Sequence, residues 1–252
     1  MKKSILIVLI GILIATLFLT VSCSKEKAVP VLKVGTNAEY PPFEFKKGNE
    51  FKGIDMDLDK LIAQKLGMKL EMIDMDFDSL IPSLGAKKID MASAAITITD
   101  ARKKVIDFSH AYYSVDQGLV AKKDSKIKIN FEKDLAKFTV GVQNGTTGQI
   151  YLDKNLVKKG IMPKSNLKKY PTNIEAITDM LNGNVDLVIL DSSAGDGYAA
   201  LKPIKTVYTI KTGEHYGLAL QKNSPLKAKI DSALKEILNS DEWNKIIQTY
   251  IK

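Results

Sequence analysis

From Val31 onward, the apolar residues of this chain alternate between short runs and stripes at helical spacing. In the stretch 57–66, leucine and isoleucine recur on one face of a predicted helix, and Gly67 follows as a C-terminal cap. A second, short helix is predicted at 79–86, with Pro82 in its first turn. Strands are predicted at 31–35, 69–74, 89–96, 105–108 and 118–122.

The same alternation continues in the second half of the chain. Strands are predicted at 138–142, 167–170, 186–190, 208–210 and 216–220, and helices at 147–156, 173–181, 225–238 and 241–250. Strands that alternate with helices indicate an α/β fold with mostly parallel sheets. The two sets of units predict two α/β lobes, and small ligands bind such sheets beyond the carboxyl ends of their strands.

Residues 1–22 are predicted to be a secretory signal peptide. Two lysines precede an almost unbroken apolar stretch over 5–21. That stretch is also long enough for an uncleaved membrane anchor. Cys23 follows it and is the only cysteine, so no internal disulfide can form. Residues 19–23 resemble a bacterial lipoprotein signal, although Thr20 stands where leucine is usual. The resemblance implies a lipid on Cys23, a tether over 23–30, and a folded part outside the cytoplasm, held at the membrane.

The chain carries a formal net charge of +8, but its lysines are spread along the whole length. A protein that binds nucleic acid would gather them on one segment together with aromatic residues. We therefore expect no nucleic-acid partner, and we interpret the lysines as solvated surface.

The candidate motifs for catalysis and for metal binding are incomplete in this sequence. Asp55, Asp57 and Asp59 alternate as in a calcium loop, but Lys60 stands where that loop needs glycine. Asp55 or Asp57 is therefore predicted to be a helix N-cap. The two histidines lie apart from any nucleophile motif, and Gly-x-Ser-x-Gly is absent. We expect no cofactor, no metal site and no catalytic residue.

Two oppositely charged residues follow predicted strands in different halves of the chain. Arg102 comes shortly after an apolar run that also contains two threonines. Asp191 follows directly after a second apolar run at 187–190. A guanidinium forms two parallel hydrogen bonds with a carboxylate. A cleft between the lobes that brought Arg102 and Asp191 together would fit a zwitterion.

Several short motifs occur in a fixed order along the chain: Val34–Phe45 (VGTNAEYPPFEF), Gly53–Leu58 (GIDMDL), Ile96–Arg102 (ITITDAR), Asp107–Ser109 (DFS), Tyr112-Tyr113, Val140–Thr147 (VGVQNGTT) and Leu190-Asp191. Over residues 32–252 this set resembles the family 3 solute-binding proteins of polar amino-acid ABC transporters. The resemblance implies a type II periplasmic-binding fold with lobe 1 at 31–115 plus 219–252 and lobe 2 at 120–213. The hinge would lie near 113–119 and 212–218.

The same resemblance implies roles for individual residues. Arg102 would pair with the ligand α-carboxylate, and Thr97 and Thr147 would donate hydrogen bonds beside it. Asp191 would take the α-ammonium, together with the carbonyl of Ala95.

The residues that would face the ligand side chain depart from the family pattern. Tyr40 would stack on the side chain, but Ile54 stands where many relatives have a second aromatic residue. Asn37 replaces the aspartate of many relatives that bind basic or amide ligands. Glu39 and Glu44 would supply a compensating charge or lie exposed on the rim.

The resemblance implies a monomeric, non-enzymatic protein that delivers a polar L-amino acid to an ABC transporter permease. Glutamine, arginine and lysine remain open as ligands. One alternative is an enzyme similar to cyclohexadienyl dehydratases, which share the fold. Another is a sensing module that acts through a separate membrane receptor.

Overall fold

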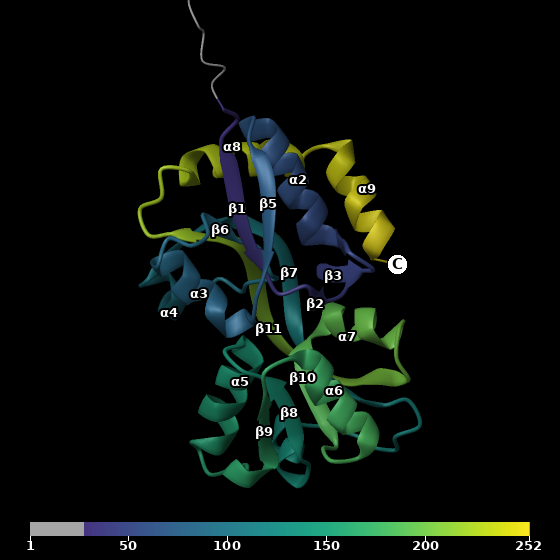
Figure 1. Ribbon diagram of the computed structural model, residues 1–252. Coiled ribbons are helices and arrows are strands. Elements are labelled where there is room, and N and C mark those ends of the chain that lie inside the picture. Colours follow the sequence, from purple (N-terminus) through teal and green to yellow (C-terminus); the bar gives the residue numbers. More distant parts are fainter. Residues whose placement is uncertain (1–27, 252) are drawn as a thin grey trace, which may run out of the picture.

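The structure is a computed structural model, and it describes residues 28–251. Two lobes lie one above the other in Figure 1. The first lobe contains β1 (Val31–Thr36), β2 (Glu39–Tyr40), β3 (Glu44–Lys47), β4 (Glu50–Lys52), α2 (Ile54–Leu66), β5 (Lys69–Asp74), α3 (Phe77–Gly85), β6 (Met91–Ala92), α4 (Asp100–Lys103), α8 (Lys227–Leu238) and α9 (Asp241–Tyr250). The second contains η1 (Glu132–Lys137), β8 (Val140–Gln143), α5 (Thr147–Leu152), η2 (Asp153–Val157), η3 (Lys164–Asn166), β9 (Leu167–Tyr170), α6 (Asn173–Asn182), β10 (Leu187–Asp191) and α7 (Ser192–Ala199).

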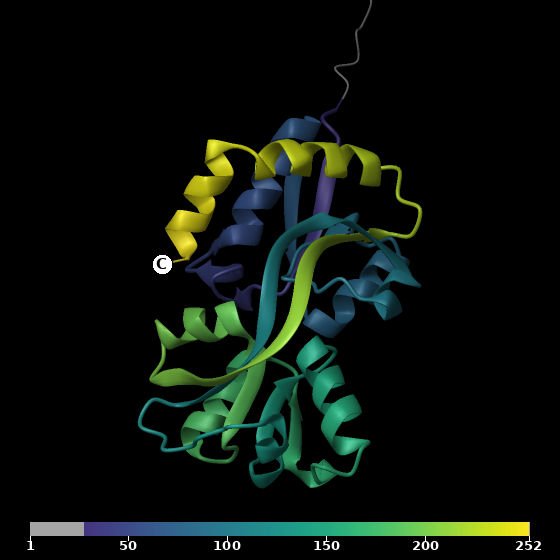
Figure 2. The ribbon, with the colours of Figure 1, turned by 180° about the vertical axis from the view of Figure 1, so that it is seen from behind.

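Two long strands, β7 (Ile106–Lys122) and β11 (Ile204–Gln221), run side by side through both lobes (Figure 2). The strand order is β5-β1-β6-β11-β7-β10-β8-β9. The outer strands of each lobe pair in parallel. The strands β7 and β11 pair antiparallel with each other and with their neighbours β10 and β6. The two-lobed α/β class predicted from the sequence is therefore confirmed.

Each lobe has its own apolar core. In the first lobe, Leu58 of α2 packs with Leu218 of β11, Leu234 of α8 and Trp243 of α9, so the C-terminal helices complete the lobe that the N-terminal strands begin. In the second, Val140 and Ile189 lie in one cluster on one side of the sheet, with another cluster around α6 and α7. Each lobe is therefore packed around apolar clusters of its own.

The long strands are the main difference from the predicted elements. The predicted strands 105–108 and 118–122 are the two ends of β7, and 208–210 and 216–220 belong to β11. The middle of each strand mixes exposed polar residues with buried ones, because it crosses between the lobes and only some of its side chains face a core. A register shift between Ile210 and Glu214 marks this crossing in β11.

Several helix starts also differ from the prediction. Helix α2 begins at Ile54 after Gly53, where a Cβ would lie 2.1 Å from the carbonyl oxygen of Phe43. The N-cap prediction for Asp55 or Asp57 is therefore wrong, because both lie inside the helix. Pro82 lies within α3 rather than in its first turn, and α7 was not predicted.

Residues 1–22 and Cys23, for which a signal peptide and a lipid were predicted, lie outside the described residues. Between residues 28 and 251, every helix is too short or too polar to cross a membrane.

Candidate ligand-binding site

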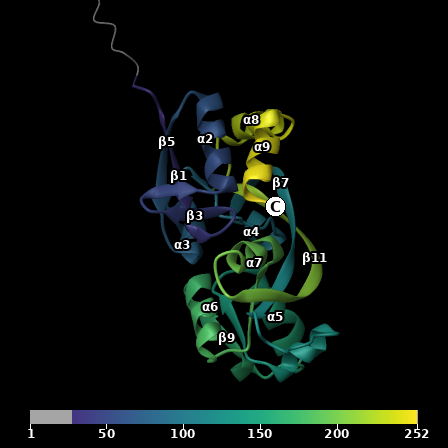
Figure 3. The same cartoon turned by 90° about the vertical axis from the view of Figure 1, so that its right-hand side faces the viewer.

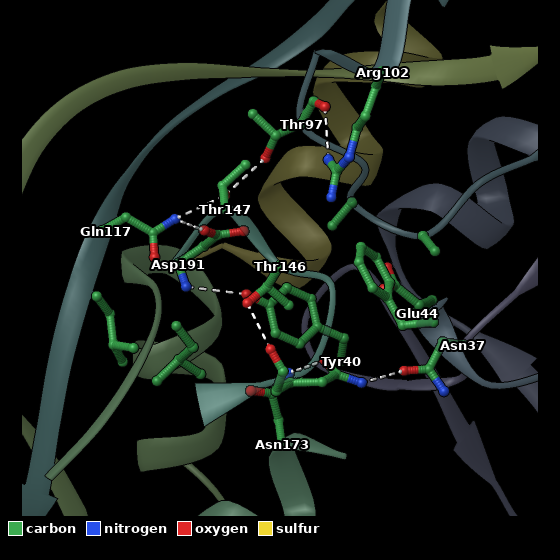
Figure 4. Close-up of a pocket in the computed structure, with 16 residues that line it drawn as sticks. Asn37, Tyr40, Glu44, Thr97, Arg102, Gln117, Thr146, Thr147, Asn173 and Asp191 are labelled. Carbon is green, nitrogen blue, oxygen red and sulfur yellow. Dashed lines mark hydrogen bonds between the residues drawn. The ribbon is translucent and has the colours of Figure 1, made fainter. Parts of the chain in front are cut away.

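A cavity lies between the two lobes, beside the middle of β7 (Figure 4). Residues from both lobes line it, and most are polar. They are Asn37, Tyr40, Glu44, Phe77, Ala94, Ala95, Thr97, Arg102, Gln117, Gln143, Thr146, Thr147, Asn173, Ile189, Leu190 and Asp191. Seven of the eight predicted ligand-binding residues are in this set, and Ile54 is not.

Arg102 reaches the cavity from the short helix α4. The Thr99 hydroxyl accepts a hydrogen bond from the Arg102 backbone N–H and so caps the helix. The guanidinium donates to the Thr97 carbonyl at 2.7 Å and, across the cleft, to the Gly145 carbonyl at 3.0 Å. It also lies over the Phe77 ring, 5.7 Å from its centre. Burial lowers the pKa of Arg102, partly offset by the charges of Asp191 and Glu214. A desolvated cation of this kind attracts a carboxylate strongly.

Asp191 ends β10 and is only 7% exposed. Its carboxylate accepts hydrogen bonds from the Tyr216 hydroxyl and the Gln117 amide, and its backbone N–H donates to the Tyr40 hydroxyl at 3.0 Å. Burial raises the pKa of Asp191 to about 6; the Tyr216 hydrogen bond opposes the rise and the charge of Glu214 adds to it. The Asp191 carboxylate is thus buried and forms no ion pair with a lysine, arginine or histidine of residues 28–251, so a cation beside it would lower its pKa.

Donors and acceptors from both lobes meet between these two charges. The hydroxyl oxygens of Thr97 and Thr147 lie 3.5 Å apart, although one belongs to each lobe. Ala95 adopts a positive φ of 47°, and its N–H donates to the buried carboxylate of Asp55 at 2.8 Å. Asp55, which with Asp57 was one of the two candidates for the helix cap, instead accepts a hydrogen bond from this loop. Asn37 accepts from the Gln143 amide at 3.2 Å.

The side-chain end of the cavity differs from the sequence prediction. Ile54 is fully buried in the core of the first lobe, so the predicted ligand contact at this position is corrected. Glu44, which had been placed on the rim as one alternative, is only 1% exposed and lines the cavity. Its Oε2 atom has no hydrogen-bond partner among the described residues. Burial, followed by the charges of Asp55 and Asp191, raises the pKa of Glu44 well above its usual range.

Sequence reasoning did not anticipate Phe77 or Gln117 as lining residues. Phe77 supplies an aromatic face from the start of α3. Gln117 projects from β7 into the cavity. Its place there could have been predicted only by recognising residues 106–122 as one continuous strand.

Further contacts between the lobes lie along α7, which faces the β2–β3 region (Figure 3). The Tyr198 hydroxyl donates to the Glu39 carbonyl, and the hydroxyls of Tyr113 and Ser193 lie 3.0 Å apart. Gly197 lies directly against Pro41. The lobes therefore meet both along α7 and at the contacts of Arg102 with Gly145 and of Thr97 with Thr147.

Two lobes that enclose a polar cavity at paired hinge strands define a ligand-binding protein whose lobes close on a small solute. The chain belongs to the bacterial extracellular solute-binding proteins, family 3, which residues 32–252 match.

Named relatives extend this picture. The arginine-binding extracellular protein ArtP of Bacillus subtilis (strain 168) is 33% identical over 227 residues, which cover 88% of this chain and 86% of ArtP. A similar solved structure is the arginine-, lysine-, histidine-binding protein ArtJ of Geobacillus stearothermophilus, with a TM-score of 0.80 and 35% identity over 88% of this chain and 95% of that one. The ancestral amino acid-binding protein AncCDT-1, described as a precursor of cyclohexadienyl dehydratase, has a TM-score of 0.78 and 33% identity over 88% of this chain and 95% of its own.

Proposed function

We propose that the protein binds a cationic L-amino acid, with L-arginine as the first candidate, and delivers it to the permease of an ABC importer. The observation that carries the choice of ligand is the buried carboxylate of Glu44, which lines the cavity and has one oxygen without a partner. Burial raises the pKa of Glu44 and so disfavours its charged form in the empty cavity, whereas a cation beside it would favour the carboxylate and form an ion pair with it.

The proposed pose follows the charges of the cavity. The ligand α-carboxylate pairs with Arg102, beside the hydroxyls of Thr97 and Thr147. The α-ammonium pairs with Asp191 and the Ala95 carbonyl. Hydrogen bonds to charged groups contribute about 1.5–3 kcal/mol each.

The ligand side chain then extends toward Tyr40 and Asn37, with its cation at Glu44. An α-amino acid zwitterion neutralises Arg102 and Asp191 and leaves Glu44 for the third charge. The names of ArtP and ArtJ support this choice, since both bind arginine.

The lobe boundaries and the anchor belong to the same proposal. Residues 31–115 plus 219–252 move as one body and 120–213 as the other, with the hinge at 113–119 and 212–218. The continuity of β7 and β11 supports this division. The protein acts as a monomer outside the cytoplasm, after cleavage of residues 1–22, and a lipid on Cys23 holds it at the membrane.

We propose a binding protein rather than an enzyme. The dehydratase alternative requires prephenate, which has no amine to pair with Asp191. An assay for phenylpyruvate formation from prephenate separates the two, because a binding protein releases no phenylpyruvate.

Calorimetric titration with arginine, lysine, histidine and glutamine tests the proposed ligand. Wild type is expected to prefer arginine, and Glu44→Gln is expected to weaken arginine binding about 10- to 150-fold, which corresponds to 1.5–3 kcal/mol. Glutamine binding should change much less. Glu39→Gln is the matched control, because that neighbouring carboxylate is half-buried and does not line the cavity. Equal affinity of wild type for glutamine and arginine, with no effect of Glu44→Gln, would refute the proposal.

A further inference from the structure

We infer that Glu214, on the hinge strand β11, is a positioning residue of the α-ammonium subsite and acts through Gln117 and Thr147. It makes the site select amino acids over analogues that lack the amine. This inference rests on the proposed function, because it assigns a further residue to the same cavity.

Three acceptors converge on the amide nitrogen of Gln117. The nitrogen lies within hydrogen-bond distance of the Asp191 carboxylate, of Glu214 Oε2 at 2.8 Å and of the Thr147 hydroxyl at 3.3 Å. A side-chain amide has two N–H hydrogens, so it cannot satisfy all three acceptors. The Gln117 carbonyl oxygen is also buried and has no partner among the described residues. The cluster is therefore short of donors, and an ammonium group brings three.

Glu214 adds a second negative charge to this cluster. Its Oε2 also accepts from the Thr147 hydroxyl at 3.0 Å, so it orients both polar side chains that border Asp191. No lysine, arginine or histidine within residues 28–251 forms an ion pair with Glu214. Burial raises the pKa of Asp191, and the charge of Glu214 adds to that rise. An α-ammonium would relieve this repulsion, whereas an analogue without the amine would leave it in place.

The backbone of β11 fixes this arrangement. Asp116 accepts hydrogen bonds from the backbone N–H groups of Thr212 and Gly213, each at 3.0 Å. The register shift ends at Glu214, which pairs with Val115 on β7. The irregularity between Ile210 and Glu214 therefore sets the register at which Glu214 rejoins β7, and in this register its carboxylate reaches the Gln117 amide.

The test compares L-arginine with 5-guanidinopentanoate, which keeps the carboxylate and the guanidinium but lacks the amine. In wild type, calorimetry is expected to show a strong preference for arginine. Glu214→Gln should lower arginine affinity about ten-fold and leave the affinity for the analogue within about two-fold, so the ratio of the two dissociation constants falls.

The control is Asp153→Asn, which removes a carboxylate that accepts from the Gln149 amide at 3.1 Å, away from the cavity. Glu214→Asp keeps the charge and should recover part of the ratio, with folding checked by circular dichroism. An unchanged ratio in Glu214→Gln, or an equal loss for both ligands, overturns the inference. Failure of wild type to bind arginine refutes the proposed ligand instead, so the two failures are distinguishable.

Discussion

Substitution of Gly197 by alanine tests whether direct contact between the lobes limits closure. Gly197 lies on α7 in the second lobe, and a Cβ there would be 2.5 Å from the carbonyl oxygen of Pro41 in the first. The same atom would be 2.7 Å from the carbonyl carbon of Pro41 and 2.9 Å from Cδ of Pro42. Because the neighbours are backbone and a proline ring, no flexible side chain can move aside.

The penalty falls on the closed arrangement alone, because the clashing atoms belong to different lobes. Overpacking of this kind costs about 1–3 kcal/mol. Ligand affinity should therefore fall about 5- to 150-fold, although Gly197 does not line the cavity. The ligand-free protein should keep its stability or gain about 0.4–1 kcal/mol, because alanine restricts the unfolded chain more than glycine does.

Calorimetry with the preferred amino acid measures the affinity, and small-angle X-ray scattering measures the ligand-dependent compaction. Gly195→Ala is the matched control on the same helix, since its Cβ would meet Val120 and Thr206 of its own lobe at 3.1 and 3.5 Å. The reasoning is refuted if Gly197→Ala binds and compacts like wild type, or if both variants lose affinity equally.

The remaining predictions concern single residues. Arg102→Ala should abolish binding of amino acids and leave the circular dichroism spectrum unchanged; micromolar affinity in a titration would show that the carboxylate is held elsewhere. Lowering the pH from 7 to 5 should weaken binding about ten-fold, because burial raises the pKa of Asp191 to about 6 and protonation removes the charge that pairs with the ammonium. Ile54→Ala should lower the free energy of unfolding by about 2–5 kcal/mol in urea titrations, because its side chain is fully buried in the core. Cys23→Ser should release the protein from the membrane fraction on cell fractionation, whereas retention there would contradict a lipid anchor.

The sequence allowed the charged ends of the site to be predicted, because Arg102 and Asp191 each follow an apolar run in a different lobe. The hinge was harder to recognise. Its strands contain polar residues such as Gln117 and Glu214, and these break the apolar pattern that identifies a strand inside a core. Gln117, which lines the cavity, and Glu214, which accepts a hydrogen bond from it, were missed for the same reason.

The wrong predictions for Ile54, which was expected to contact the ligand, and for Glu44, for which an exposed rim position was one alternative, have a different cause. A charged residue within an aromatic-rich segment suggests an exposed rim, and an apolar residue at a known ligand position suggests a contact. In the structure, the buried surroundings of Glu44 include Asp191 from the other lobe. Burial of this kind depends on how the lobes meet, which local sequence patterns do not report.

The charges of the cavity explain how a ligand would drive closure. Arg102 and the carboxyl groups of Asp191 and Glu44 line the same cavity, and Glu214 accepts a hydrogen bond from the cavity residue Gln117, so acidic groups outnumber the one cation there. Closure without a ligand buries Glu44 and leaves one of its oxygens unpaired, and the raised pKa of Glu44 shows that the empty cavity disfavours the charged form of this carboxyl group. A cationic amino acid brings two positive charges and one negative charge, which pair with the two cavity carboxylates and Arg102. The ligand therefore favours the closed form by the penalty it removes, and an uncharged side chain would leave part of that penalty in place.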